Sequence, residues 1–406
     1  MSSTLEHDPR VVAEQQGLRG FVASLGRRLR EGDVGQLPVL LGLVVIAIIF
    51  QRASHGLFLT PFNMVNLTSQ MAAVGTMSVG VVLILLLGEI DLSVGIVSGM
   101  CAAVMAVLTV ILDVSPAIGL GLGILTGTAV GLFQGAWITL FGIPSFVVTL
   151  SGLIGWQGVL LHVLGRNGTI NLQDPLILGL ANTYLKGATA YAVALAFLLY
   201  VAGGPILAQL RRGRAGLVAP MSFVVARGAV VSAAVLGAVF ALERDRGVAL
   251  GLVFLLALIV LMDFVLRRTR LGRMIYAIGG NAEAARRAGL PVQRIRVLVF
   301  VLASTLAAWG GMLGASRLRA VNQSAGQGQV LLNAIAAAVI GGTSLFGGRG
   351  SVWSALFGIL VIQSISNGMD MLSLQNSIKM MVTAGVLLAA VTIDAILRRG
   401  RQASGR

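Results

Sequence analysis

Residues 267–296 read RRTRLGRMIYAIGGNAEAARRAGLPVQRIR and form a hydrophilic island between long apolar stretches. Eight arginines fall inside this island, and the core of a bilayer excludes such a density of charge. Asn281 is typical of a helix start, Glu283 of a first turn, and Gly289 followed by Pro291 of a helix end. The sequence therefore predicts a short capped helix over roughly residues 282–288.

The predicted helix has two different faces. Ala284, Ala285 and Ala288 form a small apolar face, and Glu283 can pair with Arg287 at i,i+4 spacing. A short capped helix on the basic side of a membrane protein is typical of a docking element. An ordinary solvated loop has the same composition, so the residues by themselves leave both interpretations open.

The rest of the chain is strongly apolar. Of its 406 residues 56% are hydrophobic and only 11% are charged, with a mean hydropathy of +0.91, whereas soluble domains are about 25% charged. This composition predicts an all-α, polytopic membrane protein. The net charge of +15 would suggest nucleic acid as the partner of a soluble protein, but here the basic residues follow the membrane topology. The single cysteine, Cys101, excludes an internal disulfide, and no cofactor or metal site is predicted.

Twelve apolar stretches have the length needed to span a bilayer. They cover roughly residues 38–54, 64–87, 92–112, 117–138, 145–165, 188–210, 217–240, 247–266, 296–316, 330–346, 351–371 and 377–397. Twelve crossings would put both termini on one side, together with 21 of the 30 basic residues against 7 on the other side. The positive-inside rule makes that side cytoplasmic. The predicted domains are a cytoplasmic tail at 1–37, a permease domain at 38–397 with a cytoplasmic loop at 267–296, and a tail at 398–406. A ten-helix scheme, in which residues 188–240 are partly interfacial, stays open.

Glycines recur at every fourth residue of the fourth apolar stretch. Such spacing places small residues on one helix face and lets two helix backbones approach closely. The stretch is therefore predicted to make a tight helix–helix contact, not a ligand site, through Gly119, Gly123, Gly127, Gly131 and Gly135.

Two glycine-rich turns occupy related places in the chain, GEIDLSVG at 88–95 and GGTSLFGGRG at 341–350. Each follows one apolar stretch and precedes another, which predicts an internal duplication. The halves would cover residues 38–180 and 247–397, with inserted helices at about 188–245. Paired broken helices indicate a transport path, and Glu89 and Asp91 in the first turn would then face it. A position at a helix end in headgroup water, or a role in capping the next helix, accounts for both carboxylates equally well.

Motifs of catalysis and nucleotide binding are missing from the sequence. It contains no Walker A lysine loop, no HExxH, no CxxC and no nucleophile elbow, so the chain is predicted to be a transporter and not an enzyme. Uphill transport would then need an ion gradient or a separate ATPase. Acidic residues are few within the apolar halves, and the candidates for a proton relay are Glu89, Asp91 and Asp370. One carboxylate can suffice for a proton-driven secondary transporter.

Three motifs in this order resemble a known family. They are GEIDLSVG at 88–95, YAIGGNAEAARRAGL at 276–290 and GGTSLFGGRGSVWSALFGILVIQSISNGMDML at 341–372. The chain resembles the permease subunits of bacterial ribose/xylose-type sugar ABC importers, the second carbohydrate-uptake class, over most of residues 40–397. The additional apolar material at 188–245 is similar to the xylose branch. Family members commonly have glycine at the position of Glu89.

The resemblance implies partners, a solute and a location. Two permease copies would form the path, a cytoplasmic ABC ATPase with two domains (often fused in one polypeptide) would dock beneath them, and an extracytoplasmic binding protein would deliver a monosaccharide such as D-xylose. The complex would lie in the bacterial cytoplasmic (inner) membrane. A permease for branched-chain amino acids is the alternative within the same fold.

The resemblance also assigns candidate residues. Coupling to the ATPase would involve Asn281, Glu283, Ala284, Ala285, Arg286 and Gly289. Candidates for the translocation path are Glu89, Asp91, Ser93, Thr343, Ser344 and Asn367.

Overall fold

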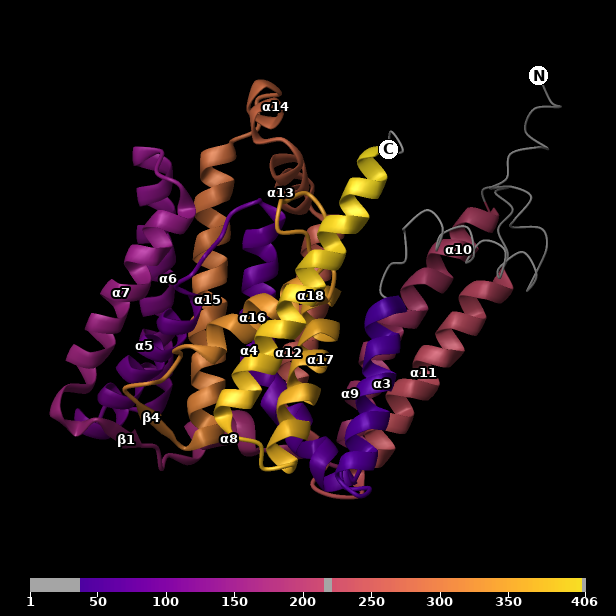
Figure 1. Cartoon of the computed structure of the whole chain (residues 1–406), viewed down its shortest axis with the longest axis horizontal. Coiled ribbons are helices and arrows are strands. Elements are labelled where there is room, and N and C mark those ends of the chain that lie inside the picture. Colours follow the sequence, from indigo (N-terminus) through magenta and orange to yellow (C-terminus); the bar gives the residue numbers. More distant parts are fainter. Residues whose placement is uncertain (1–36, 215–220, 404–406) are drawn as a thin grey trace.

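The computed structural model describes residues 37–214 and 221–403, and most of these residues are helical (Figure 1). Residues 1–36 of the predicted N-terminal tail and residues 404–406 of the C-terminal tail lie outside the described residues. The α-helices are α3 Leu37–Ala53, α4 Pro61–Leu86, α5 Val94–Ala106, α6 Pro116–Phe141, α7 Ser145–Leu164, α8 Pro175–Asn182, α9 Ala188–Leu198, α10 Gly204–Arg214, α11 Met221–Glu243, α12 Leu250–Arg268, α13 Arg270–Gly280, α14 Ala282–Arg287, α15 Val292–Leu318, α16 Gln329–Ile340, α17 Trp353–Met371 and α18 Asn376–Ala403. Shorter elements are the π-helical turns η1 Val107–Ile111 and η3 Leu199–Gly203, the 3₁₀ turn η2 Gly165–Asn167, and the strands β1 Thr169–Asn171, β2 Tyr184–Leu185, β3 Val248–Ala249 and β4 Ala320–Asn322.

Each of the twelve predicted apolar stretches contains a helix, and the prediction of an all-α polytopic membrane protein is confirmed. Within the described residues, eight helices or joined helices are long and apolar enough to cross a bilayer: Pro61–Leu86, Val94–Ile111, Pro116–Phe141, Ser145–Leu164, Ala188–Arg211, Val224–Glu243, Leu250–Arg268 and Val292–Leu318. Twelve crossings, and the side on which the termini lie, stay predictions. Helix α16 has only 12 residues and so measures about 18 Å at about 1.5 Å per residue, short of the roughly 30 Å hydrocarbon core.

Helix α15 packs against α4, α5 and α6 at the centre of the bundle (Figure 1). The five glycines of α6 are all buried, and a β-carbon added to Gly127 or Gly131 would lie 2.6 Å from the β-carbon of Ala308 or 2.5 Å from the carbonyl oxygen of Phe300. Side chains do not fit at such distances, so glycine is what lets the α6 and α15 backbones touch. The end of this face near Gly119 packs instead on Thr109 of η1.

Two irregular segments enter the bundle from opposite ends. Residues 87–93 follow α4 and return into the bundle to start α5, and residues 319–328 follow α15 and return to start α16 (Figure 1). The 341–350 turn, which the sequence analysis paired with 88–95, lies beside that turn: the Gly348 amide donates to the Leu86 carbonyl oxygen at 2.9 Å. The two glycine-rich turns thus lie side by side, and the internal duplication stays a prediction.

Short backbone ladders close the end of the bundle that lies away from α14 (Figure 1). Strand β1 pairs antiparallel with β4, with Ile170 opposite Val321, and β2 pairs with β3. The Ser316 hydroxyl, at the end of α15, accepts a hydrogen bond from the Ala181 amide at 3.0 Å and so fixes α8 against α15. We call this end of the molecule the β1–β4 end and the opposite end the α14 end.

The contact between α6 and α15 can be tested by adding bulk to it. We expect Gly127→Leu to prevent assembly of the bundle, because the added β-carbon would also lie 2.7 Å from the Ser304 carbonyl oxygen and overpacking of a tight contact costs about 1–3 kcal/mol or more. The measurement is the monodisperse fraction after detergent extraction and size-exclusion chromatography. Gly121→Leu is the matched control on the same helix, since no atom lies within 4 Å of a β-carbon there. Equal behaviour of the two variants would contradict the packing argument.

Candidate functional site

The α14 end carries a short hydrophilic hairpin made of α13 and α14. Thr269 starts α13, because its hydroxyl accepts a hydrogen bond from the Gly272 amide at 3.4 Å. Asn281 both ends α13 and caps α14, since its side-chain oxygen accepts from the Ala284 amide at 2.9 Å. Gly289 then stops α14 with a φ of +79°, which favours glycine. Local sequence chemistry thus fixes the shape of this hairpin.

The two faces of α14 differ from the expectation at one residue. Ala285 is only 6% exposed and belongs to the hydrophobic core that includes Ile275 and Ile278 of α13. The expectation that Ala285 shares an outward face with Ala284 and Ala288 is therefore corrected: its side chain contacts the permease itself. The outward face consists of exposed residues, namely Glu283, Ala284, Arg286, Arg287 and Ala288.

Ion pairs cross this outward face. The Glu283 carboxylate contacts Arg286 Nη2 at 2.5 Å and Arg287 Nε at 3.1 Å. The arginine side chains are 71% and 80% exposed, and ion pairs in such solvent contribute little to stability. Both arginines are consequently available for a partner.

Three segments meet in backbone contact directly beneath the hairpin. A β-carbon added to Gly279 of α13 would lie 1.8 Å from the Leu86 carbonyl oxygen at the end of α4. One added to Gly347 would lie 2.6 Å from the Gly279 carbonyl oxygen and 2.9 Å from Gly88 Cα. We call Gly88, Gly279, Gly347 and Gly348 the glycine junction. It joins α13, the turn after α4 and the turn before α17, so these three segments cannot move independently.

Side chains reinforce the glycine junction on two sides. The Tyr276 hydroxyl donates to the Gly350 carbonyl oxygen at 2.9 Å, and burial raises the pKa of this phenol above its usual value, so it stays a donor. Glu89 forms an ion pair with Arg296 of α15 at 2.7 Å, with side chains 15% and 26% exposed. Glu89 thus connects the turn after α4 to the helix that follows α14.

A third connection runs through Asp263 of α12, which is 5% exposed. Its carboxylate accepts hydrogen bonds from Trp353 Nε1 and from the Tyr200 hydroxyl, both at 2.9 Å, and pairs with Arg267 at 2.7 Å. Trp353 is the first residue of α17. The end of the 341–350 turn is therefore fixed to α12 and to the inserted helices as well as to α13.

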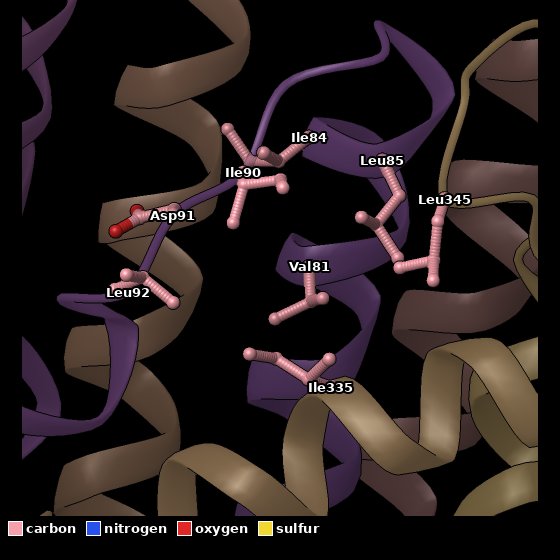
Figure 2. A pocket seen from close by; sticks show the side chains of 8 residues that line it. All are labelled: Val81, Ile84, Leu85, Ile90, Asp91, Leu92, Ile335 and Leu345. Atoms are coloured by element: carbon pink, nitrogen blue, oxygen red, sulfur yellow. The ribbon is translucent and has the colours of Figure 1, made fainter. Parts of the chain in front are cut away.

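A cavity of about 200 Å³ lies next to the glycine junction, between α4, residues 90–92 and α16 (Figure 2). Its lining is apolar apart from one carboxylate: Val81, Ile84, Leu85, Ile90, Asp91, Leu92, Ile335 and Leu345. In Figure 2 the Asp91 carboxylate points away from the other seven side chains. One of its oxygens accepts from the Ser93 amide and hydroxyl, both at 2.7 Å, and the other has no partner among the described residues. This geometry is that of a residue shaping the start of α5.

The remaining path candidates fall in two places. Thr343 and Ser344 are buried in the turn beside the glycine junction, at the same end as Glu89 and Asp91. Asn367 lies near the β1–β4 end, where its side-chain oxygen accepts from Asn63 of α4 at 2.8 Å. The structure therefore does not bring the six candidates together in one site. Within the described residues, no group of three or more His, Cys, Asp or Glu side chains is placed to hold a metal ion.

Several residues of this site are not among those that the sequence predicts. Gly279 stands within the 276–290 motif, and its Gly-Gly pair with Gly280 is a signal of close backbone approach. Arg296 and Asp263 give no such signal, because each pairs with a residue that becomes its neighbour only through the fold.

The glycine junction can be tested with two adjacent residues. We expect Gly279→Ala to lower the thermal stability of the purified permease clearly, because the methyl group would overlap the Leu86 carbonyl oxygen and overpacking costs about 1–3 kcal/mol or more. Gly280→Ala is the matched control, since nothing lies within 4 Å of a β-carbon there. Fluorescence-detected unfolding in detergent measures both. A melting temperature equally unchanged in both variants would refute the close contact.

Comparison with known proteins gives the chain its relatives. It is 35% identical over 359 residues to the xylose transport system permease protein XylH of Escherichia coli (strain K12), which covers 88% of this chain and 91% of that protein. The corresponding protein of Haemophilus influenzae is 33% identical, over 90% of this chain and 98% of that protein. The ribose import permease protein RbsC of Bacillus subtilis (strain 168) is 30% identical, over 90% and 94%. No solved structure is significantly similar to the chain.

The model of one protein family matches residues 63–391 and so covers the whole site, from the turn after α4 to α17. This range includes all three motifs of the sequence analysis. The chain therefore belongs to the family of membrane transport permeases described as the branched-chain amino acid transport system permease component.

Proposed function

We propose that this chain is the membrane-spanning permease subunit of an ATP-driven importer of a monosaccharide, a pentose such as D-xylose. The observation that carries the proposal is that xylose permeases align with about nine-tenths of both chains. Ribose permeases align over a similar range, so sugar is the common solute of these relatives. The proposed location is the bacterial cytoplasmic membrane, and ATP is hydrolysed in a partner protein.

The exposed face of α14 is the proposed docking surface for the ATPase, which we propose to be a tandem-domain chain.

 The support for this surface is geometric: α14 is exposed, basic and rigidly capped, and it sits on the glycine junction that links α4, α13 and α17. In the proposed topology twelve crossings put this hairpin and both termini in the cytoplasm, in line with the distribution of arginines. A movement of the ATPase would then reach both glycine-rich turns through backbone contacts.

Two further partners complete the proposal. A second copy of the permease would form the other wall of the path, and an extracytoplasmic sugar-binding protein would dock on the β1–β4 end. Because the binding protein would supply most of the specificity, the permease needs only a weakly binding path.

The two alternatives differ in what they require. An ion-gradient transporter needs a carboxylate that is free to take up and release an ion, but Glu89 pairs with Arg296, Asp263 with Arg267 and Asp370 with Lys379. Asp91 differs from these three, because one of its oxygens bonds to Ser93 and the other has no partner among the described residues. These pairings favour the ATP-driven importer. A permease for branched-chain amino acids would have the same fold, and the sugar relatives are the reason to prefer a sugar.

Transport by the reconstituted complex tests the proposed function. We expect proteoliposomes that contain the permease, its ATPase and its binding protein to accumulate radiolabelled D-xylose when ATP is supplied, and to stop when vanadate blocks hydrolysis. The same vesicles with a pH difference but no ATP should accumulate none. Uptake of leucine and not of xylose would show that the solute is an amino acid. Xylose uptake driven by the pH difference alone would refute an ATP-driven importer.

Docking on α14 can be tested at two neighbouring alanines. We expect Ala284→Glu to leave membrane abundance unchanged, because Ala284 is exposed and glutamate suits the first turn of a helix, but to abolish ATPase co-purification and xylose uptake. Ala285→Glu should instead lower membrane abundance, because it would bury an unpaired charge at a residue that is 6% exposed. Normal ATPase binding and uptake in Ala284→Glu would exclude this face of α14 from docking.

A further inference from the structure

The segment 319–328 carries irregular backbone from the β1–β4 end into the middle of the bundle. Its Ala325 and Gly326 lie against the first turns of α5, where a β-carbon added to Gly99 would be 2.0 Å from the Ala325 carbonyl oxygen and one added to Gly95 2.5 Å from that of Gly326. Helix α16 then starts about halfway between the α14 end and the β1–β4 end of the bundle (Figure 1). At membrane depth, non-helical backbone occurs only where protein buries it or where it lines a water-filled space.

Uncharged amide side chains are concentrated along this segment and the start of α16. Gln323 is exposed, and Gln327 and Gln329 are half-buried. Gln327 reaches back to the Gln323 carbonyl oxygen at 2.7 Å, whereas the Gln329 amide has no hydrogen-bond partner among the described residues. Residues 320–335 contain no charged side chain at all. Amide side chains that face lipid would lose their hydrogen bonds to water. We therefore expect water next to these three glutamines.

The exposed side of α16 leads from these amides to the apolar cavity. Gln329, Leu332 and Ile335 follow one another at i,i+3 spacing, so each is next to the preceding one on the helix surface. Leu332 is 45% exposed, and Ile335 lines the cavity next to Val81 of α4 (Figure 2). The amide side chains thus give way to a mostly apolar cavity next to the glycine junction, and an apolar segment can close a path by excluding water.

We infer that this side of α16, with residues 322–328, lines the outer half of the translocation path, and that a second copy of the chain covers it. The inference rests on the proposed function and adds residues to it: Gln323, Gln327 and Gln329 line the path, and Leu332 and Ile335 lead into its gate. An amide both donates and accepts hydrogen bonds, which suits the hydroxyl groups of a sugar. A zwitterionic amino acid would find no charged group on this lining.

Water accessibility tests the inference separately from transport. In a Cys101→Ala background, Gln329→Cys and Leu332→Cys are expressed with the ATPase and the binding protein in whole cells and treated with a membrane-impermeant thiol reagent. Ile154→Cys is the matched control, because Ile154 is a 70% exposed residue in the middle of α7. We expect the two α16 cysteines to react at least roughly tenfold faster than the control, since a thiol reacts as the thiolate and is inert in apolar surroundings.

D-xylose is the probe for contact with solute. We expect it to slow labelling of Gln329→Cys, the residue among the amides. Labelling of both α16 cysteines no faster than that of Ile154→Cys would overturn the inference, even if the wild-type complex imports xylose. Rapid labelling in a complex that imports no xylose would instead support the path and refute the proposed sugar.

Discussion

The close contact of α15 with its neighbours is the constraint on which the rest of the bundle depends. Glycines on both sides make it possible: Gly131 of α6 admits the Phe300 carbonyl of α15, and Gly310 and Gly311 of α15 admit the Ala73 and Ser98 carbonyls of α4 and α5. In a bilayer, where hydrophobic burial does not drive helices together, such backbone packing supplies much of the association. Because α15 follows α14 directly through Pro291, the hairpin of α13 and α14 is attached to a helix that packs tightly against α4, α5 and α6.

The glycine junction extends this rigidity to the turns that border the cavity. Gly279 lies against Leu86 and Gly347 without an intervening side chain, so a displacement of α13 moves the end of α4 and the turn before α17 at once. The Glu89–Arg296 pair adds a connection from the turn after α4 to α15. A hairpin on a flexible tether could bind a partner equally well, but it would transmit little of the partner's motion.

Local chemistry explains which features the sequence predicts well. The Asn281 cap, the stop at Gly289 and the four-residue glycine period of α6 depend on neighbours in the chain, and the structure contains all three. The inward direction of Ala285 was not predictable, because three alanines on a two-turn helix look alike until the surface beneath them is known. The contact of the 341–350 turn with the turn after α4 cannot be predicted from the sequence, because it depends on how α4, α13 and the start of α17 pack together.

Asp263 shows how the inserted helices become part of the same mechanical unit. A buried carboxylate needs compensating donors, and Asp263 obtains them from three elements at once: Tyr200 of η3, Trp353 of α17 and Arg267 of its own helix. Removal of any one donor leaves the others attached to a less well compensated charge, so the three contacts support one another. Since Trp353 starts α17 directly after the turn that meets Gly279, this carboxylate holds the far side of that turn. The turn is thus held between α13 on one side and α12 with the inserted helices on the other, and any motion that opens the cavity beside it must work against both.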